Sequence, residues 1–198
     1  MNIKRVTITV HSNHLIKRQK TEEALSNYLS ITKADPGNLK AWKDAGYCYR
    51  MLKRYDKALE AYQKVIAGNN RALAASAYIG MGKIYEDTGQ IEQAFKAYDE
   101  SAKIYRHNCD ACLGIARLYA KTDNRGMAIY WANEAVETNR HNWHAWLLLA
   151  KQYFAADQLE NAKKAYQKVL EINPEIRDAH QGIKSVESRI KLQGKPNS

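Results

Sequence analysis

The sequence has few of the residues that stabilise secreted proteins and none of the long apolar segments that cross membranes. It holds 3 Cys and 3 Pro among 198 residues. Three cysteines cannot all pair with one another, and free thiols favour the reducing conditions of the cytoplasm. No segment approaches the roughly 18 consecutive apolar residues of a membrane-spanning helix, and the first residues lack the apolar core of a signal peptide. A cytoplasmic protein without a membrane span is therefore expected.

Motifs that are typical of enzymes are also missing. The sequence contains no GxSxG motif, no HExxH motif and no paired-carboxylate pattern. The segment IGMGKIY at 79–85 includes GxGK, but the other residues of a phosphate-binding loop and its preceding strand are absent. We therefore expect no enzyme and no bound cofactor, and we assign no catalytic residue.

The formal net charge of +10 is concentrated at the two ends of the chain. Residues 1–21 carry five basic and no acidic residues, and residues 184–198 carry four basic residues and one acidic residue. The long segment between these ends contributes only +2. Such ends are usually solvated tails, which argues against nucleic acid as the main partner. Association with nucleic acid or an anionic surface through the basic termini is kept as the alternative function.

A repeat runs through most of the sequence. Alanine recurs with spacings of 36, 34 and 34, at Ala58, Ala94, Ala128 and Ala162. Each alanine follows a tyrosine by nine residues and a glycine or alanine by twelve. The residue sixteen positions earlier is aromatic in three units and cysteine in the other: Trp42, Tyr78, Cys112 and Trp146. Apolar residues at spacings of three and four at the start of each unit indicate one face of a helix.

This pattern resembles the tetratricopeptide repeat, in which aromatic residues, a Leu-Gly pair, Tyr, Ala and Pro recur with a period of about 34 residues. The resemblance implies an all-α fold, a right-handed superhelical solenoid of helical hairpins. Four tandem repeats are expected within 39–174, as hairpins at 39–68, 71–104, 109–138 and 143–172. We interpret residues 21–36 as the second helix of a half repeat, 175–192 as a capping helix and 193–198 as a disordered tail. Residues 1–20 form a basic segment without an assigned structure, in which VTITV (6–10) alternates like a strand.

A stack of such hairpins has an extended concave surface, where a binding function is expected. The resemblance implies that one stripe of each first helix lines this groove. The matching residues are Lys43, Tyr47, Arg50, Ile79, Lys83, Leu113, Arg117, Leu147, Lys151 and Phe154. We call them the predicted binding surface.

Within the predicted binding surface, apolar and basic residues each recur once per repeat at equivalent positions: Ile79, Leu113 and Leu147, and Lys83, Arg117 and Lys151. A protein or peptide with hydrophobic anchors and acidic groups would match this arrangement. The other interpretation is that the apolar residues pack in the core and the cations solvate the surface. The expected function is a scaffold or adaptor that binds such a partner, as an assembly factor or co-chaperone-like protein.

Some members of the family clamp the terminal carboxylate of heat-shock chaperones with a Lys-Asn-Asn-Lys-Arg set. The matching positions here are Lys43, Tyr47, Gly80, Asp110 and Gly114. Only Lys43 agrees with the set, and Asp110 would repel a carboxylate. We therefore expect an adaptor without this clamp.

The sequence contains one Cys-x-x-Cys pair and one His-x-x-His pair, which are candidates for a redox or zinc site. Cys109 and Cys112 form the first pair, and His141 and His144 form the second, one repeat later. Cys112 stands at an aromatic position of the repeat, which predicts packing in the core. Equivalent positions of neighbouring helices lie about 8–10 Å apart, too far for shared ligands. No metal site is expected.

Overall fold

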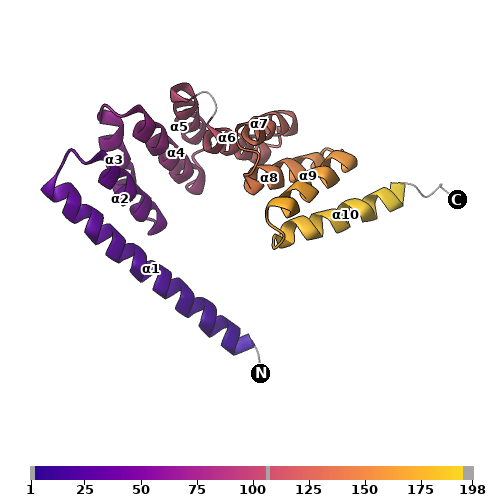
Figure 1. Cartoon of the computed structure of the whole chain (residues 1–198), viewed down its shortest axis with the longest axis horizontal. Coiled ribbons are helices and arrows are strands. Elements are labelled where there is room, and N and C mark those ends of the chain that lie inside the picture. Colours follow the sequence, from indigo (N-terminus) through magenta and orange to yellow (C-terminus); the bar gives the residue numbers. More distant parts are fainter. Residues whose placement is uncertain (1–2, 106–107, 194–198) are drawn as a thin grey trace. The chain divides into compact units, whose positions relative to one another are not determined.

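The computed structural model describes residues 3–105 and 108–193, with side chains from residue 17 onward. Every regular element in these residues is a helix (Figure 1), so the predicted all-α class is confirmed. The chain divides between Ile104 and Tyr105 into two compact units, which are described separately. None of the described helices combines the length and the apolar character needed to cross a membrane.

Each unit consists of five helices that pack in sequence order. The helices of the first unit are α1 (Ile3–Ala34), α2 (Leu39–Met51), α3 (Tyr55–Ala67), α4 (Arg71–Asp87) and α5 (Ile91–Ile104). Those of the second unit are α6 (Cys109–Lys121), α7 (Arg125–Thr138), α8 (Trp143–Ala155), α9 (Leu159–Ile172) and α10 (Arg177–Gln193). Each helix contacts its successor within the unit, and the first helices of consecutive hairpins also touch, α2 with α4, α6 with α8 and α8 with α10.

The turn between the two helices of each hairpin has the same backbone conformation. One residue in each turn has a positive φ: Lys53 (57°), Gly89 (75°), Asp123 (55°) and Asp157 (57°). A residue in this left-handed region ends the first helix, and glycine adopts it without steric cost. These residues are spaced by 36, 34 and 34, like the repeat alanines, so the turn belongs to the repeat.

Asparagine caps the first helix of each hairpin. The side-chain oxygens of Asn38, Asn70, Asn108 and Asn142 accept hydrogen bonds from backbone N–H groups in the first turns of α2, α4, α6 and α8. These N–H groups have no partner within the helix, and such a cap contributes about 1 kcal/mol of stability.

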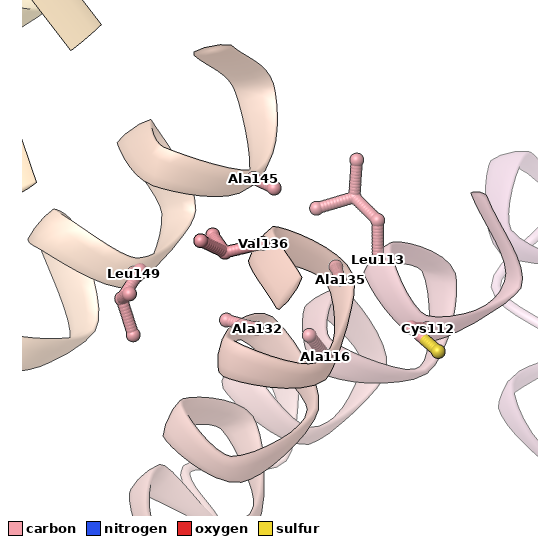
Figure 2. Packing of buried hydrophobic residues seen from close by; sticks show 8 residues of the cluster. All are labelled: Cys112, Leu113, Ala116, Ala132, Ala135, Val136, Ala145 and Leu149. Carbon is pink, nitrogen blue, oxygen red and sulfur yellow. The ribbon is translucent and has the colours of Figure 1, made fainter. Parts of the chain in front are cut away.

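The small residues of the repeat lie where the two helices of a hairpin cross. All four repeat alanines, Ala58, Ala94, Ala128 and Ala162, are fully buried. Figure 2 shows this packing in the second unit, where Ala116 of α6 and Ala132 of α7 lie between the two helices and Val136 points toward α8. Larger side chains at these crossings would force the helices apart.

Tyrosines on the second helices fill spaces that glycines leave on the first helices. The ring of Tyr62 lies between Gly46 of α2 and Gly80 of α4, and it is almost fully buried. A Cβ on Gly46 would lie 2.8 Å from this ring, and a Cβ on Gly80 would overlap it. Tyr166 of α9 lies against Gly182 of α10 in the same way. The glycines are therefore required by the bulk of the tyrosine.

At the hairpin formed by α6 and α7, the small residue lies on the second helix and the large residue on the first helix that follows it. Ala132 stands at the position of Tyr62, and Leu148 of α8 stands at the position of Gly80. Leu148 packs against the buried cluster that contains Ala132. The large residue has thus moved from one helix to the other, and the space between the helices stays filled.

The helix at the N-terminus is longer than the half repeat expected from the sequence. α1 is continuous from Ile3 to Ala34, so the VTITV segment is helical. Residues 17–20, Lys-Arg-Gln-Lys, are good helix formers and include none of the residues that favour a positive φ. The helix therefore continues where a complete repeat would turn. At the other end α10 reaches Gln193, and the rest of the predicted tail lies outside the described residues.

Candidate functional site

On α2, the residues of the predicted binding surface form a basic and aromatic group. Tyr47 is 53% exposed, and the guanidinium of Arg50 lies 5.7 Å from the centre of its ring. Arg50 also forms an ion pair of 3.3 Å with Asp87 at the end of α4. Lys43, half-buried, forms an ion pair of 3.2 Å with Asp44. A ligand at this helix would meet an exposed phenol ring beside two cations.

On α4 and α6, two apolar residues of the predicted surface are buried. Ile79 is 8% exposed and Leu113 is 7% exposed, and Leu113 belongs to a buried cluster that includes Ala145 of α8, the next first helix. Figure 2 shows Leu113 directed toward Ala145 of α8. Ile79 and Leu113 therefore fit the interpretation that the apolar residues pack in the core. Lys83 and Arg117, one turn further along the same helices, are half-buried.

On α8, the predicted residues are engaged by the C-terminal helix. Lys151 Nζ donates a 2.6 Å hydrogen bond to Asp178 Oδ2 of α10. The guanidinium of Arg189 lies 4.9 Å from the centre of the Phe154 ring. Leu147 is half-buried and packs against the core shared by α8, α9 and α10. The last helix thus covers part of the surface that the sequence assigned to a ligand.

Two lysines hold carboxylates of α10 and lower their pKa values. The hydrogen bond from Lys151 depresses the pKa of Asp178, and the 2.8 Å bond from Lys163 of α9 depresses that of Glu187. A carboxyl whose pKa is lower in the folded protein stabilises the fold above its unfolded pKa of about 4. This contribution is lost as the pH falls through the folded value. Both pairs are exposed, so the effect is small and local.

Acidification from pH 6 to pH 3 is therefore expected to loosen α10 before α8 and α9. Amide hydrogen exchange, corrected for the intrinsic effect of pH, should rise several-fold more in α10 than in α9. The variant with both Lys151→Met and Lys163→Met should show fast exchange in α10 already at pH 6, with little further change on acidification. Equal protection of α10 at both pH values in the native chain would contradict this.

The cysteines are free thiols in a packed environment. Burial raises the pKa of Cys112 to about 11, and burial also raises that of Cys109, although Asn142 Nδ2 donates to its sulfur at 3.1 Å. Both are therefore neutral thiols at pH 7 and weak nucleophiles. Cys112 is 2% exposed, as expected for a residue that packs in the core. In the described part of the chain, no group of three or more His, Cys, Asp or Glu side chains could hold a metal.

A cavity of about 520 Å³ lies between α1 and α2, and Tyr47 is the one residue of the predicted binding surface among its lining residues. Its walls include Lys17, Lys20, Ala24 and Tyr28 of α1 and Tyr47 and Cys48 of α2. We call it the α1/α2 groove. The signal for it in the sequence is the half repeat itself, because a second helix without its first helix leaves one face uncovered.

Three family models match the sequence, and each describes a tetratricopeptide repeat. They match residues 9–72, 41–107 and 143–176. The first of these ranges includes much of α1, so the family pattern extends into the residues that precede the four complete hairpins.

Known proteins that resemble this chain differ widely in the share of their length that it matches. Protein bimA of Emericella nidulans is 28% identical over 96 residues, which make up 48% of this chain and 12% of that protein. A thermophilic tetratricopeptide repeat protein of Thermus thermophilus superposes with a TM-score of 0.70 at 18% identity, over 93% of this chain and 96% of that chain. The first such domain of Spaghetti (RPAP3), solved with the HSP90 peptide SRMEEVD, has a TM-score of 0.57 at 25% identity, over 59% and 93%.

Proposed function

Since the chain belongs to the tetratricopeptide repeat family, we propose that it is a scaffold or adaptor that binds a partner peptide along the first helices of its hairpins. The peptide carries acidic groups next to apolar anchors, and the protein acts as an assembly factor or co-chaperone-like adaptor. Stacked helical repeats expose long surfaces for such ligands, which supports a scaffold rather than an enzyme.

The observation that carries this proposal is the ion pair between Lys151 and Asp178. Lys83, Arg117 and Lys151 occupy equivalent positions on α4, α6 and α8. At Lys151 a carboxylate from another helix already lies 2.6 Å from the ammonium group. We propose that a carboxylate of a peptide that lies along α6 or α4 forms the same kind of charge-assisted hydrogen bond with Arg117 or Lys83.

The apolar part of the ligand contacts other residues than the sequence alone suggests. Ile79 and Leu113 are buried, so the exposed ring of Tyr47 and the half-buried Leu147 are the apolar contacts in the two units. The peptide bound by Spaghetti (RPAP3), SRMEEVD, combines two Glu and one Asp with Met and Val. Support for this ligand class thus comes from a related fold that binds an acidic and apolar peptide.

We do not propose that this chain binds a terminal carboxylate with the clamp of chaperone adaptors. Gly80 lies beneath the ring of Tyr62, and Asp110 presents an exposed carboxylate at the start of α6. Lys43 already faces Asp44 at 3.2 Å. These residues would not hold the two oxygens of a terminal carboxylate, so acidic side chains within the peptide are the proposed contacts.

The proposal predicts that Arg117→Glu weakens binding of the natural partner more than tenfold. Loss of one charge-assisted hydrogen bond costs about 1.5–3 kcal/mol, and the introduced carboxylate adds repulsion. The partner is first isolated by affinity purification with the native chain and identified by mass spectrometry, and its dissociation constant is then measured by calorimetry. The melting temperature should change little, because the half-buried Arg117 is not part of the buried cluster around α6.

The matched control is Lys164→Glu. Lys164 is an exposed residue of α9 in the same unit, and this substitution changes the charge by the same amount as Arg117→Glu. It should leave the dissociation constant within about twofold. If Arg117→Glu and Lys164→Glu bind the partner equally well, the first helices are not the binding surface and the proposal fails.

A further inference from the structure

One face of α1 is exposed at positions that are buried in every complete repeat. Ile31 of α1 is 43% exposed. The equivalent residues of the four complete hairpins are all fully buried: Val65, Ser101, Ala135 and Val169. Ala24 and Tyr28 are also more exposed than their equivalents in α3, Ala58 and Tyr62.

No described helix covers this face of α1 in the way that a first helix covers the second helix of a hairpin. In each complete hairpin the first helix covers the second, as α2 covers α3 and α8 covers α9. α1 corresponds to a second helix, and no described helix precedes it. Its Ala24 and Tyr28 instead line the α1/α2 groove.

The α1/α2 groove corresponds to a place that a helix occupies in the next repeat. There, α2 packs against both α3 and α4. The groove wall on α2 includes the exposed Tyr47 and the buried Cys48, and the equivalent residues of α4 are the half-buried Lys83 and the fully buried Ile84. The groove therefore has the two walls, one from each neighbouring helix, between which a first helix normally lies.

The rim of the groove is positively charged. Lys17 and Lys20 line it, and Arg18 lines a second cavity of about 250 Å³ that shares Lys17. Among the described side chains, none of these three cations forms an ion pair. The acidic groups of this region already have partners. Glu22 accepts two hydrogen bonds from the guanidinium of Arg54, at 2.7 and 3.1 Å, Glu23 accepts one from Gln19 at 3.1 Å, and Asp44, which also lines the groove, forms an ion pair with Lys43.

We infer that the α1/α2 groove is a docking site for an acidic amphipathic helix of a partner protein, which completes the half repeat. The apolar side of this helix covers Ala24, Tyr28 and Ile31, and its carboxylates face Lys17 and Lys20. A small residue opposite Tyr28 gives the ring the space that Gly46 gives Tyr62. The site shares only Tyr47 with the predicted binding surface, so it extends the proposed function to a second surface.

Charge distinguishes this occupant from the N-terminal residues of the chain itself. Residues 1–16 carry Lys4 and Arg5 and no acidic residue, so they would bring like charge to a cationic rim. An acidic helix from another protein instead gains attraction from Lys17 and Lys20.

The test uses the full chain and two fluorescent, hydrocarbon-stapled peptides with the apolar pattern of α2. The staple is needed because an isolated helix of this length is marginally stable in water. One peptide has glutamate at all polar positions and its twin has lysine. Fluorescence anisotropy at low salt should show at least tenfold tighter binding of the glutamate peptide. The double variant with Lys17→Glu and Lys20→Glu should reverse this order.

Three further measurements separate the possible occupants. Ala24→Trp fills the groove and should weaken binding of the glutamate peptide at least tenfold, while the circular dichroism spectrum of the protein stays unchanged. Arg117→Glu should leave peptide binding unchanged, so this site and the proposed surface in the second unit can fail independently. Equal affinity for the two peptides, or no reversal by the double charge variant, would overturn the inference. Three other results would also overturn it. Binding of the peptide only after removal of residues 1–16 would show that these residues fill the groove, and a dimer that Ala24→Trp dissociates would show that a second copy of the chain fills it. Displacement of the peptide by a single-stranded oligonucleotide would show that the groove binds nucleic acid.

Discussion

Replacement of Gly80 by leucine is expected to destabilise the protein by about 3 kcal/mol. Gly80 lies on α4 against the ring of Tyr62, where even a Cβ atom would overlap the ring. The ring cannot move away, because Gly46 of α2 confines its opposite side. A leucine at position 80 must therefore separate α3 from α4 or force the tyrosine out of its buried site.

A second substitution should rescue this variant. Tyr62→Ala alone leaves a cavity and costs about 4 kcal/mol. In the double variant the leucine fills the space of the ring, as Leu148 does beside Ala132 in the second unit. We expect the double variant to be more stable than either single variant. Because the two single costs sum to about 7 kcal/mol, this outcome requires a coupling energy of more than about 4 kcal/mol. The free energies of unfolding of the native chain, the two single variants and the double variant are measured by urea unfolding followed by circular dichroism.

The second unit offers the reverse experiment. Ala132→Tyr should destabilise the protein, since Leu148 already packs against this cluster, and Leu148→Gly should restore much of the loss. If either pair of substitutions were additive, the tyrosine and the leucine would not share one space. The alternation of large and small residues between hairpins would then have no role in packing.

Most of the fold could be predicted because it depends on residues that recur. The spacing of Ala58, Ala94, Ala128 and Ala162 places each helix crossing, and the turn residues such as Gly89 recur with the same spacing. The start of α1 could not be placed in this way. Residues 17–20 lack a turn-forming residue, but only the structure shows that the helix continues through them to Ile3.

The predicted binding surface was harder to judge, because periodicity gives the direction of a side chain but not what covers it. Ile79 and Leu113 lie on the same stripe as exposed residues, yet both are buried, and Leu113 packs in a cluster with Ala145 of the neighbouring first helix α8. Lys151 and Phe154 are engaged for a different reason, since α10 provides Asp178 and Arg189 as their partners. Such contacts depend on the packing of adjacent repeats, and a pattern within one repeat does not contain them.

The same substitution at equivalent positions of α1 and α3 is expected to cause very different losses of stability. Val65→Asp places a carboxylate in a fully buried site of the first unit and should cost at least about 4 kcal/mol. Ile31→Asp changes the equivalent side chain of α1, which is 43% exposed, and should cost less than about 0.5 kcal/mol.

Urea unfolding of both variants at pH 7 compares the two positions directly, and Val65→Ala and Ile31→Ala separate the loss of apolar contacts from the burial of charge. Alanine should cost about 2 kcal/mol at position 65 and almost nothing at position 31. The difference between aspartate and alanine should therefore be large only in α3. An equally large penalty for Ile31→Asp would mean that another segment covers this face of α1 in solution. In that case the α1/α2 groove is already filled, and a partner helix would have to displace its occupant.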